Sequence, residues 1–107
     1  MTVDASYEIE ATQLIEARMA ELRALTYEQA RALPEASGGE HQLSGVPCSV
    51  TVFAQPEPYS LPNAVLVTVQ VARKGLLGSR HIERGLVFVP GQAPREASRE
   101  ELRNTGG

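Results

Sequence analysis

The sequence predicts an α+β fold in which an N-terminal helix and a short second helix pack on a three-stranded antiparallel β-meander, followed by a short C-terminal helix. Three observations carry this prediction. Valines alternate with other residues over positions 64–73, apolar residues recur every three or four positions in the first 25 residues, and the connections between the expected strands are short. Alternation indicates a strand and three-to-four spacing a helix, and short connections favour antiparallel neighbours because parallel strands need long crossovers.

The first helix is expected to begin at Asp4 or Ser6, either of which can cap it, and to end at about Leu25. Its buried stripe is predicted to be Tyr7, Ala11, Leu14, Ile15, Leu22 and Leu25. Thr26 followed by Gln29 forms a capping-box pattern. This pattern predicts a second short helix that ends before Pro34, because the residue that precedes a proline is disfavoured in a helix.

Residues 34–45 are expected to form a loop, because serine, glycine and proline are frequent there. A first strand is predicted over 48–54, and three prolines (Pro56, Pro58 and Pro62) fill a stiff connection to the central strand. The alternating valines of the central strand are expected to face the first helix.

A third strand is expected over 80–89, where it ends at the turn dipeptide Pro90-Gly91. Ser98 and Glu101 then form a second capping-box pattern, which predicts a short helix to about Arg103. At 107 residues, the chain is expected to be one domain. Its expected parts are a helical region (1–33), a loop (34–45), an antiparallel sheet (46–91) and a C-terminal segment (92–107).

The composition predicts a soluble cytoplasmic protein. The chain has one cysteine, Cys48, which cannot form an intramolecular disulfide, and it shows neither a secretory signal pattern nor an apolar run of the length that a membrane helix needs. Nine arginines against one lysine, together with frequent alanine, indicate a bacterial source.

No catalytic site, metal site or cofactor is expected from the residues. Cys48, His41 and His81 are the candidate nucleophile and bases, and they carry no local signature of a nucleophilic enzyme and no ligand-like spacing. Phosphate-binding and dinucleotide-binding glycine patterns are also absent from the sequence. A small enzyme is therefore the third choice of function.

The sheet face opposite the valines is the main functional clue. It is expected to present Phe53, Leu66, Val87 and Val89, which is more apolar than a water-facing sheet surface needs to be. Leu76 and Leu77 add an apolar pair at the tip of the last hairpin. These surfaces favour a protein-interaction or self-association module that forms a homodimer or docks on another protein, with exposed edge strands as another route to association. The alternative is that the C-terminal segment covers this face.

A basic cluster supports a second function, a small-ligand or anion-binding module. Arg73, Lys74, Arg80 and Arg84 lie within twelve positions around the last hairpin. Nucleic acid is not expected as a partner, because the net charge is −3 and interleaved aromatic residues are lacking.

Overall fold

The computed structural model describes residues 3–58, 61–73 and 80–104. A long helix, α1 (Val3–Arg23), and a one-turn helix, α2 (Tyr27–Arg31), precede four strands, β1 (Ala36–Leu43), β2 (Val46–Pro56), β3 (Val65–Arg73) and β4 (Arg80–Phe88). A two-residue strand, β5 (Arg95–Glu96), and helix α3 (Arg99–Asn104) complete the order. The predicted α+β architecture with an N-terminal helix and an antiparallel sheet is confirmed.

The sheet has five strands in the order β1-β2-β3-β4-β5, and all its neighbours are antiparallel. The prediction of three strands is therefore wrong, and so is the predicted loop over 34–45, since β1 occupies most of it. Ser44 and Gly45, with φ angles of 51° and 75°, make the two-residue turn that folds β1 back on β2. Positive φ at both turn residues matches the twist of a hairpin.

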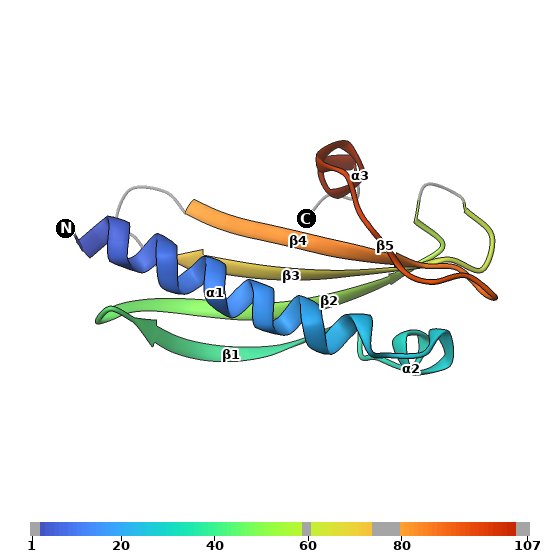
Figure 1. Ribbon diagram of the computed structural model, residues 1–107, viewed down its shortest axis with the longest axis horizontal. Coiled ribbons are helices and arrows are strands. Elements are labelled where there is room, and N and C mark those ends of the chain that lie inside the picture. Colours follow the sequence, from blue (N-terminus) through green and yellow to red (C-terminus); the bar gives the residue numbers. More distant parts are fainter. Residues whose placement is uncertain (1–2, 59–60, 74–79, 105–107) are drawn as a thin grey trace.

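Helix α1 covers one face of the sheet (Figure 1), and the alternating valines of β3 lie on this face. Val65, Val67, Val69 and Val71 are all buried in one cluster with the apolar stripe of α1. That stripe is Tyr7, Ala11, Ile15, Met19 and Leu22, so the predicted stripe is largely confirmed, although Met19 replaces the partly buried Leu14 and Leu25. We call this side of the sheet the helix face and the other side the back face.

Both capping boxes are present. The Thr26 side chain accepts a hydrogen bond from the Gln29 backbone N–H, and the Thr26 N–H donates to the Gln29 side chain over 2.9 Å. At α3, the Glu101 N–H donates to Ser98 Oγ, and the Ser98 N–H donates to Glu101 Oε1 over 2.9 Å. These bonds satisfy backbone donors at the helix starts, which is why both helices begin where the sequence predicts.

Helix α3 packs on the back face, opposite α1. Leu102 and Ala97 form a small second cluster with Ala64, Leu66 and Val87. Gly85 makes this contact close, because a Cβ there would lie 3.0 Å from Leu102 Cδ2. Among the described residues, no helix is long and apolar enough to cross a membrane.

Candidate functional site

The structure divides the predicted apolar face into a covered part and an exposed part. Leu66 and Val87 are each 1% exposed beneath α3, and Val89 is partly buried beside them. The C-terminal segment thus covers this part of the back face, so these residues do not form the open surface that the sequence suggested. Phe53, at 36% exposed, remains accessible, because its cross-strand neighbours are the small residues Ala36 and Thr68. Leu76 and Leu77 lie outside the described residues.

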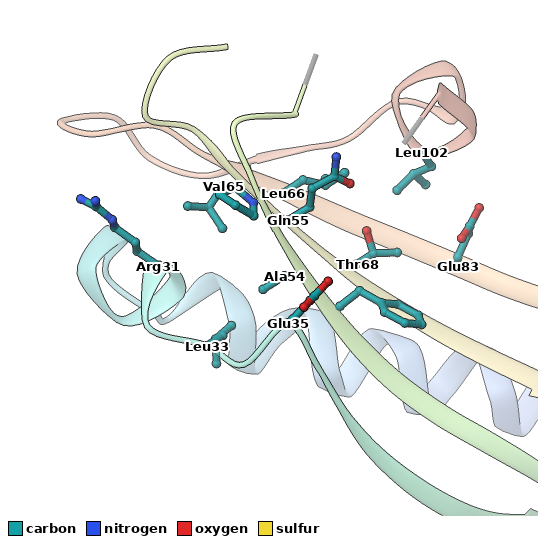
Figure 2. Close-up of a pocket in the computed structure, with 12 residues that line it drawn as sticks. Arg31, Leu33, Glu35, Ala54, Gln55, Val65, Leu66, Thr68, Glu83 and Leu102 are labelled. Atoms are coloured by element: carbon teal, nitrogen blue, oxygen red, sulfur yellow. The ribbon is translucent and has the colours of Figure 1, made fainter. Parts of the chain in front are cut away.

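A groove of about 770 Å³ lies beside Phe53. Its lining includes Phe53, Leu66, Thr68, Leu102, Glu35 and Glu83. Figure 2 shows Leu102, Thr68 and Glu83 gathered at the α3 side of the groove, whereas Arg31 and Leu33 lie toward α2. The groove is lined mainly by apolar residues, together with Arg31 and the carboxylates of Glu35 and Glu83, which suits a side chain with an apolar stem.

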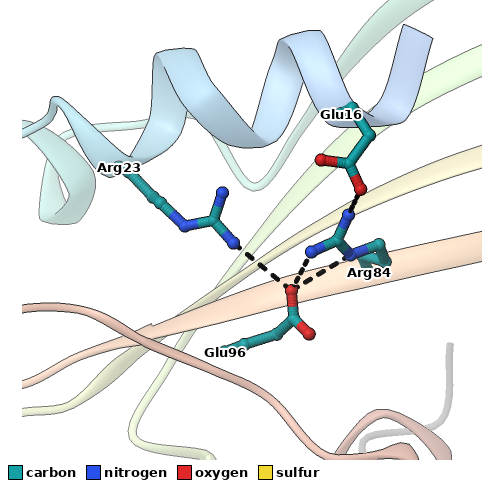
Figure 3. A network of polar contacts seen from close by, with 4 residues as sticks. All are labelled: Glu16, Arg23, Arg84 and Glu96. Atoms are coloured by element: carbon teal, nitrogen blue, oxygen red, sulfur yellow. Dashed lines mark hydrogen bonds and ion pairs between the residues drawn. The ribbon is translucent and has the colours of Figure 1, made fainter. Parts of the chain in front are cut away.

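The two members of the predicted anion cluster whose side chains the structure describes, Arg73 and Arg84, have different partners. Arg84 points to the helix face, where it pairs with Glu16 of α1 and Glu96 of β5, and Arg23 also reaches Glu96 at 3.4 Å (Figure 3). The hydrogen bond to Glu96 is the main cause that raises the pKa of Arg84. Arg84 therefore joins α1 to the β4–β5 edge.

Arg73 lies at the other end of the helix face, with its guanidinium carbon 5.6 Å from the centre of the Tyr7 ring, a cation–π distance. The pKa of the Tyr7 hydroxyl is raised, mainly because the group is buried. Lys74 and the side chain of Arg80 lie outside the described part of the structure. The described arginines of this set are thus engaged within the fold.

His41 and Cys48 are directly opposite each other on β1 and β2, whereas His81 lies two strands farther along the sheet on β4. Cys48 is 1% exposed, and burial raises the pKa of its thiol, which favours the unreactive protonated form. No group of three or more metal-ligating side chains occurs in the described part of the chain.

The surface that the sequence did not predict is strand β1. It is an edge strand of eight residues, and all of them except Leu43 are exposed. The Ser44-Gly45 turn pattern, followed by a predicted strand, could have indicated a hairpin. However, Gly38 and Gly39 lower the β-propensity of the segment before the turn.

The direction of the β1 backbone groups follows from one hydrogen bond and the register. The Ala54 N–H donates to the Glu35 carbonyl over 3.0 Å, and the same register pairs Ser37 with Val52 and Gly39 with Val50. In an antiparallel pair, every second residue bonds to the partner strand. The odd-numbered residues of β1 therefore bond to β2. Even-numbered residues such as Ala36, Gly38 and Gln42 direct their N–H and C=O groups away from β2, and we call this side of β1 the open edge.

No protein-family model, curated protein or solved structure matches this chain.

Proposed function

We propose that this protein is a non-catalytic assembly module that binds a polypeptide chain along its open edge, and that it self-associates by this route. The open edge carries the proposal, because it offers a row of backbone donors and acceptors to an added strand. An added strand is bound mainly through its backbone, so this mode needs no apolar patch on β1 itself.

The composition of β1 supports the same function. Edge strands are commonly protected from pairing by proline, charged side chains (lysine above all), bulges or a covering segment, and β1 has one such charge, Glu40. The β1 sequence, ASGGEHQL, contains neither proline nor lysine, and its eight residues pair with β2 without a bulge. Its first four side chains are small, which leaves the backbone accessible to a second strand.

The groove beside Phe53 adds a place for side chains of the bound chain. Phe53 lies directly beside Ala36, so the exposed ring and the open edge are continuous. A strand added at β1 would bring its side chains to the same back face. Backbone pairing would supply affinity, and the groove would supply selectivity for the segment bound.

The test is the absolute mass of the protein in solution, by light scattering on a sizing column over a hundredfold dilution series. We expect a mass near twice 11.5 kDa at the higher concentrations. Gln42→Pro removes an outward N–H and should weaken the dimer, whereas Gln42→Ala keeps this N–H and should not. A monomer at every concentration, or equal dimer affinity for the two variants, would contradict the proposed function.

A further inference from the structure

We infer that the groove beside Phe53 binds a primary ammonium group carried on an apolar stem. The ammonium would lie at Thr68 and Glu83, and the stem would lie against Phe53, Leu66 and Leu102. This inference goes beyond the proposed function, because it concerns the groove and stands whether or not a strand adds to the open edge. Its basis is the register of three strands, a buried hydroxyl and the charge of the groove.

The register places a hydroxyl and a carboxylate near each other on the back face. Phe53, Thr68 and Gly85 lie directly opposite one another on β2, β3 and β4. Glu83 is the diagonal neighbour of Thr68 on β4, and diagonal cross-strand neighbours lie about 7–8 Å apart. A small group placed between them can therefore contact both the Thr68 hydroxyl and the Glu83 carboxylate.

Apolar side chains surround Thr68 in the other directions. Phe53 is its direct neighbour on β2, and Leu66 precedes it on the same face of β3. On the β4 side, Leu102 of α3 lies over Gly85, where a Cβ would be 3.0 Å from Leu102 Cδ2. These walls suit an apolar stem, whereas the polar group of the ligand would lie at the end where Glu83 stands.

The hydroxyl of Thr68 indicates a ligand independently of the charges. Thr68 is only 9% exposed, and it lines the groove. No hydrogen bond joins its hydroxyl to another residue in the described ranges. A buried hydroxyl without a partner costs free energy, and a ligand donor in the groove would remove this cost. An ammonium has three N–H donors, so it can donate to Thr68 Oγ1 and to a carboxylate at once.

The charge of the groove favours a cation. Glu35 and Glu83 bring two carboxylates to the lining, against one guanidinium from Arg31. Arg31 lies toward α2, away from the α3 end where Thr68 and Glu83 lie (Figure 2). Within the part of the chain that the structure describes, Glu83 pairs with neither arginine nor lysine. Its neighbour is His81, whose Nε2 lies 3.8 Å from Glu83 Oε1 and which is charged only when protonated.

The partial burial of Glu83 strengthens this preference. Its side chain is 21% exposed, so the carboxylate has lost part of its contact with water. A partly desolvated carboxylate gains more from a cationic hydrogen-bond donor than an exposed one does. A neutral ligand of the same shape would leave the carboxylate without this compensation.

The experiment titrates the isotope-labelled full-length protein with n-hexylamine and follows the backbone amide signals by NMR. Hexan-1-ol is the neutral probe of the same length. We expect saturable shifts at Phe53, Thr68 and Glu83, and an affinity for the amine roughly tenfold above that for the alcohol. This factor is near the low end for a hydrogen bond to a charged group, because Glu83 is not fully buried.

Three variants test the residues. Glu83→Gln keeps the shape of the side chain but removes its charge, so it should weaken hexylamine binding roughly tenfold. Thr68→Val removes the hydroxyl and should weaken binding roughly threefold without lowering the free energy of unfolding, because the hydroxyl has no partner to lose. Glu8→Gln is the matched control, since Glu8 is an exposed carboxylate of α1, and it should leave the affinity unchanged.

A third probe, N-acetyl-lysine N-methylamide, distinguishes two sources of the ammonium. An affinity equal to that of hexylamine would assign the groove to a lysine side chain of a bound chain, and a much lower affinity would assign it to a free amine. Equal affinities for hexylamine and hexan-1-ol, or equal hexylamine affinities of the unmodified protein and Glu83→Gln, would overturn the inference. The dimer mass tests the proposed function separately, and Glu83→Gln should leave it unchanged.

Discussion

Charges placed at Gly39 should control which copies of the chain associate. Gly39 is the position of choice because a side chain there meets open space in the monomer, so the fold can accept it. In the proposed dimer of two antiparallel open edges, the same side chain would lie near its counterpart, because Gly39 is at the middle of β1. Gly39→Lys and Gly39→Glu should therefore each weaken self-association, and an equimolar mixture of the two should restore it as a mixed dimer.

The magnitude follows from the expected separation of the charges. For two charged groups about 6 Å apart, Coulomb's law gives about 0.7 kcal/mol in bulk water and about 3 kcal/mol at an effective dielectric constant of 20. Because each 1.4 kcal/mol changes an equilibrium constant tenfold, the dimer Kd of each single variant should rise roughly 3- to 100-fold. The mixed dimer should gain by a similar factor over either homodimer.

The assay is sedimentation equilibrium of each variant and of the mixture, at low salt and at 1 M salt. The effect should shrink at 1 M salt, where the Debye length is about 3 Å. Gln13→Lys provides a matched control, since Gln13 is an exposed residue of α1 and not part of β1. Equal Kd values for Gly39→Lys, Gly39→Glu and their mixture would refute the reasoning.

Three further predictions concern the fold that presents this edge. Leu102→Ala should lower the free energy of unfolding by about 2 kcal/mol in urea titrations, near the low end for a buried leucine because its cluster is small. Gly38→Ala should lower the free energy of unfolding by about 1–3 kcal/mol in the same assay, because its methyl group would overlap the β2 backbone. Gly39→Ala should be neutral or slightly stabilising, because its methyl group meets open space. Equal effects of the two substitutions would contradict the close approach of β1 to β2. The hydrogen bonds from Arg95, over 2.7 and 2.8 Å, are the main cause that lowers the pKa of Glu101 from 4.5 to about 2. A lowered pKa stabilises the fold above pH 4.5, and this contribution is lost as the pH falls toward 2. The unmodified protein should therefore exceed Glu101→Gln in free energy of unfolding by about 1 kcal/mol above pH 4.5, and the difference should shrink as the pH falls toward 2. The value is small because Arg95 is half-exposed. An advantage that does not change with pH would contradict the ion pair.

The elements that the sequence predicted well are those with local signals. The capping boxes at Thr26 and Ser98 are contained within four residues each, and their hydrogen bonds form as predicted. The alternation in β3 was also sufficient, because its four buried positions on the helix face, 65, 67, 69 and 71, are all valines. These patterns depend on neighbours in the chain, so no tertiary information is needed to interpret them.

Strand β1 could not be predicted in the same way. It lies at the sheet edge with nearly all of its side chains exposed, so it lacks the alternation of apolar and polar residues that indicates a strand. Its glycines also lower its β-propensity. Backbone hydrogen bonds to β2 hold it in place, and any sequence that avoids proline at the inward positions can make them.

The sequence by itself determined the α+β class, the face of β3 that packs on α1 and the start of each short helix, because periodicity and capping are local properties. Only the tertiary structure decided which apolar residues stay exposed. Leu66 and Phe53 look alike as back-face positions in the sequence, yet α3 buries Leu66 and leaves Phe53 accessible. The reason is that burial is set by segments that meet across the sheet, here through the space that Gly85 leaves for Leu102.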